Sequence, residues 1–274
     1  MKNTIGIFLL ILFTINYLYA HQSDSLVPLN KREIKLSQVE IVGKVSNRTA
    51  YRTEEVKNIA IQKSNAANLG DFLRRIPNLG GIRKGAAGID PVLRGFKYSQ
   101  LNVQVDGAKI EGGCPSRMDP ATAHVDINEL SQIKVIKGPY ALKYGVNFGG
   151  VIELVKRKTI FYPSAQNHIQ LMLGSQSNYL GAKAGINING GNKTFAYTLS
   201  ANRKNYDDYQ DGSGRTVNAA YKHMNLAGRI AFKIKPNQVL SADADRSKGY
   251  DIDFPSLPMD ERLDNTQLYH LHYK

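Results

Sequence analysis

Apolar and polar residues alternate with a period of two over the part of the chain that follows Pro163. In residues 179–189 one face carries leucine, isoleucine and alanine, and the other carries polar side chains and glycine. Residues 194–202 and 224–234 repeat the pattern, and the turn sequences NGGNK and KPNQ border these segments. Alternating segments of about ten residues are typical of transmembrane β-barrel strands, which have a lipid-facing apolar side and a polar lumenal side. We therefore expect roughly six barrel strands over residues 164–274.

An antiparallel β-sandwich is the alternative, because its strands alternate too. Such a sandwich would make the chain a secreted basic binding module or adhesin that is soluble without detergent. Three features favour the barrel: the length of the segments, the small residues mixed into the apolar face, and tyrosines near the strand ends, where an aromatic girdle would lie.

Residues 38–158 have a different pattern, with short helical and extended segments in succession. Residues 65–85 predict a short amphipathic helix that presents Leu69, Phe72, Leu73 and Ile76 on one face and stops at Pro77. Residues 91–96 and 100–110 predict strands, the second with an Asp-Gly turn, and residues 127–145 and 149–158 predict a helix-to-strand passage and a last strand. Residues 38–158 are therefore expected to form a compact α+β domain.

The N-terminus has the layout of a secretory signal peptide: a lysine, an apolar run over residues 5–15, and the small residue Ala20 before polar sequence begins. We expect cleavage after residue 20 and a flexible segment over residues 21–37. The apolar run is short for a membrane span, although Leu18 makes the cleavage site imperfect and leaves an uncleaved anchor as the alternative. The exported chain is then either soluble or inserted as a β-barrel.

The net charge of +13 points to acidic partners. The charge is dispersed, with no basic run of five or more residues, so nucleic acid is not expected as a partner and an anionic lipid or lipopolysaccharide surface fits better. No Ser-His-Asp, paired-carboxylate or phosphate-loop arrangement stands out, and we do not expect an enzyme.

The segment CPSRMDP contains Cys114, the only cysteine of the chain, and Met118. A lone cysteine excludes an intramolecular disulfide, which leaves an intermolecular bridge, a metal ligand or a small buried apolar residue. If Pro115 begins a helical turn, the spacing of four residues places both sulfurs on one face. A thiolate and a thioether form a soft pair that selects Cu(I), whereas core packing is the ordinary role of such a pair.

Three segments in order resemble the plug domain of TonB-dependent outer-membrane receptors: LGDFLRRIPNLGGIRKG, VLRGFKYSQLNVQVDGAKI and INELSQIKVIKGPYALKYGVNFGGVIELVKRK. The resemblance implies a plug inside a large barrel in the outer membrane of a Gram-negative bacterium, and import energised through the partner TonB. It makes residues 38–158 the plug and the whole chain the first part of a longer receptor. The loosely similar TonB box would comprise Gln38, Val39, Glu40, Ile41 and Val42, and such a box binds by strand addition.

Within that family, CPSRMDP is similar to the plug motif of copper receptors of the OprC/NosA type. This resemblance implies that Cys114 and Met118 are copper ligands and that copper is the transported ligand rather than a cofactor. Met259, in the expected extracellular loop 250–262, is similar to the second half of that site. Leu257 stands where the family has a histidine, so the ligand set stays open, with His124, His270 and His272 as possible replacements. The alternative cargo is a siderophore, cobalamin or another metal chelate, with Cys114 in a structural role.

Overall fold

The computed structural model describes residues 52–57, 60–61, 64, 66–138 and 144–274, all of which belong to one structural unit. The predicted signal peptide (1–20), the segment 21–37 and the TonB-box candidate (38–42) lie outside the described residues. Among the described residues, no helix combines the length and the apolar composition that a membrane span requires.

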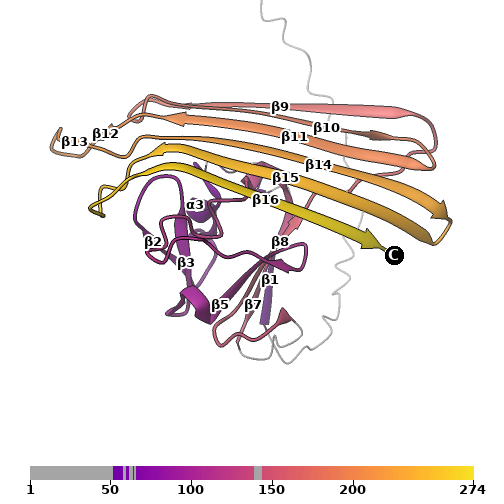
Figure 1. The fold of residues 1–274 in the computed structure, drawn as a ribbon, viewed down its shortest axis with the longest axis horizontal. Helices are drawn as coiled ribbons and strands as arrows, with labels where there is room; N and C mark the ends of the chain where they lie inside the picture. The colour runs from indigo at the N-terminus through magenta and orange to yellow at the C-terminus, as the bar shows by residue number, and fades with distance from the viewer. Residues whose placement is uncertain (1–51, 58–59, 62–63, 65, 139–143) are drawn as a thin grey trace, which may run out of the picture. The chain divides into compact units, whose positions relative to one another are not determined.

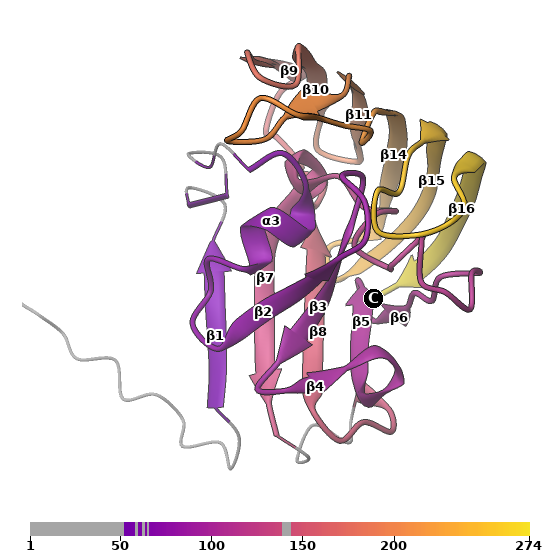
Figure 2. The same ribbon diagram turned by 90° about the vertical axis from the view of Figure 1, so that its left-hand side faces the viewer.

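A five-stranded sheet forms the centre of the first domain (Figure 2). Its strands, in spatial order, are β1 (Arg52–Lys57), β7 (Leu130–Lys137), β8 (Gly150–Lys156), β5 (Leu101–Val105) and β6 (Ala108–Lys109). The pairing of β5 with β8 is parallel and the other pairings are antiparallel. Asp106 and Gly107 join β5 to β6 with φ angles of 48° and 89°, as a two-residue hairpin turn requires, so the predicted Asp-Gly turn is confirmed.

A smaller three-stranded sheet and short helices complete this domain. The sheet contains β2 (Leu79–Arg83), β3 (Ile89–Leu93) and β4 (Phe96–Lys97), and the helices are α3 (Leu69–Leu73), η1 (Tyr98–Gln100) and η2 (Ile127–Glu129). Helix α3 begins where the Asn68 side chain accepts a hydrogen bond from the Asp71 N–H at 2.9 Å, which satisfies an otherwise free donor. All four apolar residues of the predicted helical face are buried.

The core of the first domain is apolar. Its most deeply buried side chains, at 0–1% exposure, are Leu69, Leu73, Leu93, Val105, Leu130, Ile133, Val135, Ile152 and Leu154. Burial of each such side chain contributes roughly 1.5–3 kcal/mol to folding. Helix α3 and the five-stranded sheet both supply residues to this core, so the core joins the helix to the sheet.

Six long antiparallel strands follow as a single sheet (Figure 1). They are β9 (Gln166–Gln176), β10 (Gly181–Gly191), β11 (Phe195–Tyr206), β14 (Tyr221–Lys235), β15 (Gln238–Ile252) and β16 (Glu261–Tyr273), and a small hairpin of β12 (Tyr209–Gln210) and β13 (Thr216–Val217) lies between β11 and β14 in the chain. Each long strand pairs with its sequence neighbours, and β9 and β16 are the edges. A tilted transmembrane strand needs about 9–11 residues, which all six provide.

Burial in this sheet is the reverse of burial in the first domain. On the apolar face, Leu226 and Phe232 of β14 are 41% and 47% exposed, whereas Asn225 on the polar face is only 3% exposed. Transmembrane barrel strands have this arrangement, because lipid covers the apolar face. The predicted fold class, an α+β plug followed by antiparallel transmembrane barrel strands, is confirmed. The sandwich alternative is wrong, because a sandwich would bury the apolar faces between two sheets.

Candidate metal centre

Cys114 begins a tight turn of the first domain, and Met118 directly follows this turn. The Arg117 N–H donates to the Cys114 carbonyl at 2.8 Å, and Arg117 has a φ of 56°. A residue in the left-handed region cannot continue a right-handed helix. The predicted helical placement of the two sulfurs is therefore wrong: residues 114–117 form a turn, and Met118 follows it.

Side chains hold this turn from both ends. The Asp119 carboxylate accepts hydrogen bonds from the N–H groups of Gly113 at 2.6 Å and Cys114 at 2.9 Å. The Arg117 guanidinium donates to both carboxylate oxygens of Asp90, at 2.5 and 2.9 Å, in the bidentate geometry that gives strong ion pairs. At Gly112 a Cβ atom would overlap the backbone oxygen of Asp119, so only glycine fits there.

Both sulfur-containing side chains belong to one apolar cluster, which we name the sulfur cluster. Met118 is 6% exposed, and Cys114 is partly buried against the same group. The other members are Ala86, Ala87, Tyr179, Tyr206, Tyr209, Val217, Ala219, Tyr221, Ile252, Phe254 and Leu257. Cys114 and Met118 thus pack in the same cluster, although the backbone between them is not the helical turn considered from the sequence.

The loop between β15 and β16, residues 253–260, reaches this cluster. The Asp260 carboxylate accepts a hydrogen bond from the Phe254 N–H at 3.0 Å, which closes the loop. Leu257 packs against the sulfur cluster, whereas Met259, two residues further on, is 53% exposed. The structure thus brings Leu257 close to the sulfur-bearing turn and leaves Met259 largely in solvent.

Lys84 links the loop to the turn directly. The Ser256 hydroxyl donates to the Lys84 carbonyl at 2.6 Å, and the Lys84 ammonium donates to the Ser116 carbonyl. Loop 253–260 is therefore connected to residues 114–117 by hydrogen bonds as well as by apolar packing.

His124 is buried beneath the turn, with 5% of its surface exposed. Its Nδ1 lies 3.2 Å from Asp264 Oδ2 and 3.1 Å from the Thr266 hydroxyl, and its Nε2 lies 3.8 Å from Asp119 Oδ2. Burial alone would lower the pKa of His124, but the hydrogen bond and charge of Asp264, with the charge of Asp119, raise it above its ordinary value. Both ring nitrogens already face oxygen atoms, so His124 could bind a metal only by giving up one of these partners.

His270 and His272 lie elsewhere on β16. Their rings stack with centroids 5.7 Å apart, and they face the Asp243 carboxylate at 3.9 and 3.5 Å. At about 3.3 Å per residue, His270 is roughly 20 Å along the strand from Asp264. The structure therefore does not bring these two histidines to the sulfur-bearing turn.

Charged residues of the first domain pair with the six strands at buried positions. Asp126 pairs with Lys204 of β11 at 2.8 Å, and Lys156 pairs with Asp245 of β15. Asp106 pairs with Arg229 of β14 at 2.5 Å. The sequence pattern identified neither these pairs nor the role of Asp119, although Asp119 lies within the CPSRMDP motif.

Glu129 adds a neutral acid to this interface. Burial raises the pKa of Glu129 to about 8, and the nearby Asp126 charge adds to the effect. Glu129 is therefore mostly protonated at pH 7.

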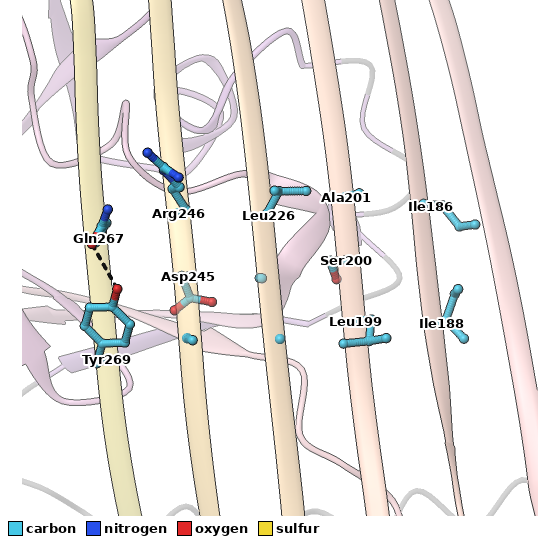
Figure 3. Close-up of a pocket in the computed structure, with 13 residues that line it drawn as sticks. Ile186, Ile188, Leu199, Ser200, Ala201, Leu226, Asp245, Arg246, Gln267 and Tyr269 are labelled. Carbon is cyan, nitrogen blue, oxygen red and sulfur yellow. Dashed lines mark hydrogen bonds between the residues drawn. The ribbon is translucent and has the colours of Figure 1, made fainter.

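The apolar face of the six strands has a shallow pocket, and Figure 3 shows the side chains that line it, from β10, β11, β14, β15 and β16. Ile186, Leu199 and Leu226 supply much of its apolar surface, and the Tyr269 hydroxyl donates to Gln267 at 2.9 Å. Its lining residues all belong to the six strands, so this pocket is distinct from the sulfur-bearing turn.

Within the described part of the chain, no group of three or more His, Cys, Asp or Glu side chains is arranged to hold a metal ion. A metal site at the sulfur-bearing turn would therefore depend on the thioether of Met118 as well as on the thiolate of Cys114.

Comparison with known families and structures agrees with this architecture. Residues 46–151 match the family model of the TonB-dependent Receptor Plug Domain. This region is a TonB-dependent receptor plug domain. The sequence resemblance to TonB-dependent receptors is thus confirmed, and the first domain is called the plug from here on.

Several solved structures are similar to the chain. The copper transporter OprC aligns with a TM-score of 0.75 and 25% identity, over 81% of this chain and 34% of that chain. The FpvAI–pyocin S2 complex gives 0.60 and 18%, over 73% of this chain and 25% of that chain. The siderophore receptor PirA from Acinetobacter baumannii gives 0.56 and 20%, over 72% and 31%. The chain therefore spans about a third of the length of OprC, and no curated protein matches its sequence.

Proposed function

We propose that this chain is part of a TonB-dependent outer-membrane receptor that imports copper, and that Cys114 and Met118 bind the ion on its way through. The observation that carries the proposal is the hydrogen-bonded turn at Cys114, which is followed directly by Met118 in the same apolar cluster, so that a thiol and a thioether lie in one environment. The likeness to the copper transporter OprC supports it. Copper is the cargo in this proposal rather than a resident cofactor.

The chemistry of the donors favours monovalent copper. Thiolate and thioether sulfur are soft ligands, which prefer Cu(I) to hard ions such as Mg²⁺ and Ca²⁺. Their apolar surroundings also suit an ion whose charge a single thiolate neutralises. Met259 and His124 remain candidates for further ligands, but each would have to move or exchange partners first.

The proposed partners follow from the same architecture. TonB would bind the segment Gln38–Val42 by strand addition and supply the energy for import. Outer-membrane lipid would cover the apolar face of the six strands, and lipopolysaccharide would contact the outer rim. No enzymatic step is part of the proposed function.

A metal chelate is the second candidate cargo. Receptors for siderophores share the fold, as the likeness to PirA illustrates. In that case Cys114 would be a packing residue of the sulfur cluster, and a siderophore, cobalamin or similar chelate would bind elsewhere on the outer side of the plug.

Copper accumulation in cells tests the proposal. Cells that produce the full-length receptor are compared with cells that produce Cys114→Ser or Met118→Ala, with receptor amounts matched in outer-membrane fractions. We expect both substitutions to abolish receptor-dependent accumulation, because each removes a proposed ligand. Met224→Ala is the matched control, since Met224 lies on the apolar face of β14 and should leave uptake unchanged. Equal accumulation with the parent and Cys114→Ser would contradict the copper proposal.

A further inference from the structure

The Asp119 carboxylate binds the backbone at Cys114, the proposed thiolate ligand. Its two carboxylate oxygens accept from adjacent N–H groups, those of Gly113 and Cys114. Asp119 is 8% exposed, so water could replace these bonds only in part. Loss of the carboxylate would leave both N–H groups without their acceptor and free the turn to change conformation.

His124 continues this contact toward the strands. Its Nε2 faces Asp119 Oδ2, the same oxygen that accepts from Gly113. Its Nδ1 faces Asp264 and Thr266, which both lie on β16. The His124 side chain is 1% exposed and the two carboxylates are 10% exposed, so solvent screens these interactions weakly.

Asp264 lies just beyond loop 253–260. That loop contacts the turn through Ser256 and Lys84, and β16 contacts the turn through Asp264, His124 and Asp119. Both sets of contacts begin at residues close together in sequence, Ser256 and Asp264. One set ends at Ser116 and the other at the N–H groups of residues 113 and 114, so they reach the turn on either side of the Cys114 side chain. A displacement of β16 or of its loop would therefore move the turn.

We infer that His124 and Asp264 are positioning residues, which act through Asp119 to hold Cys114 and Met118 in a metal-binding arrangement and couple that arrangement to strand β16. The inference rests on the proposed copper function. Residues that orient a ligand without touching the metal typically change metal affinity about 10–100-fold when they are removed.

Cu(I) affinity of the purified full-length receptor tests the inference, measured in detergent by competition with a chromogenic Cu(I) chelator. We expect His124→Ala and Asp264→Ala each to weaken binding about 10–100-fold. Asp264→Asn should recover most of the affinity, because its amide oxygen still accepts a hydrogen bond from His124. The His124→Ala/Asp264→Ala double variant should bind no more weakly than the weaker single variant, since both changes break one link.

Controls separate the possible failures. Asp207→Ala removes an exposed carboxylate near the end of β11 and should bind Cu(I) like the parent. Thermal melting of every variant shows whether it folds. If His124→Ala does not fold, the inference is tested by comparing the Cu(I) affinities of Asp264→Ala and Asp264→Asn. Parental affinity in a folded Asp264→Ala variant would overturn the inference. A parent that binds no Cu(I) would instead overturn the proposed function.

Discussion

The plug and the six-stranded sheet bury opposite kinds of side chain. In the plug the buried side chains are apolar, such as those of Ile133 and Leu154. In the sheet the buried side chains are those of the polar face, such as Asn225 and Ser200. The apolar side chains of the sheet, such as Leu226, are instead exposed. Apolar side chains are therefore buried in the plug and exposed on one face of the sheet, and the second arrangement is typical of transmembrane barrel strands.

This difference explains why charges meet where the two regions touch. A polar strand face needs partners when it packs on the plug, and Asp126, Asp106 and Lys156 supply them. Buried ion pairs of this kind add little net stability over apolar packing, but they penalise any arrangement that leaves one charge alone. They therefore favour one position of the plug against the strands.

The largest expected effect comes from breaking one of these pairs. Asp126→Asn leaves Lys204 buried without its countercharge, and we expect the free energy of unfolding of the full-length receptor to fall by about 3–5 kcal/mol. Chemical denaturation in detergent measures it. Asp126→Asn combined with Lys204→Met is the control and should recover much of the loss. A single variant as stable as the parent would show that the pair does not hold the two regions together.

A charge on the apolar face tests the lipid assignment. Leu226→Arg should destabilise insertion by roughly 2–4 kcal/mol, the cost of arginine near the membrane midplane. The amount of folded receptor in outer-membrane fractions reports the effect, and Leu226→Ile is the matched control. Undiminished insertion of Leu226→Arg would mean that this face does not contact lipid.

The smallest effect is a change in pH dependence caused by Glu129. The pKa of Glu129 is about 8 in the folded state and near 4.5 when unfolded, so the folded state binds the extra proton between these values and stability falls as pH rises from about 4.5 to 8. Glu129→Gln should remove this slope and stabilise the receptor at pH 8, with little change at pH 4. Melting temperatures across this pH range measure it. If the melting temperatures of the parent and of Glu129→Gln changed in parallel with pH, Glu129 would not be a protonated, neutral acid in the folded state.

Local patterns sufficed to predict much of the fold. The period of two gave the six strands, and the Asp-Gly pair gave the turn at residues 106–107. The helical turn considered from Pro115 onward does not form, because Arg117 adopts a left-handed conformation while its side chain binds Asp90, 27 residues earlier. Such a contact depends on the tertiary fold, which helix spacing does not encode.

The candidate site was predictable only in its sulfur atoms. Cys114 and Met118 stand together in the sequence, but the link from His124 to β16 joins residues 142 positions apart at Thr266. Met259 was expected near the sulfurs from a family resemblance, whereas the loop packs Leu257 against the sulfur cluster and leaves Met259 exposed. The sequence gives no local signal for which side of a loop faces the plug.

The copper content of the purified receptor shows whether Cys114 binds copper. The full-length protein and its Cys114→Ser variant are purified from outer membranes of copper-supplemented cells, and their metal content is determined by elemental analysis. We expect a stoichiometric amount of copper in the parent and little in the variant. Equal copper contents, or no copper in either protein, would contradict it and return Cys114 to a packing role in the sulfur cluster.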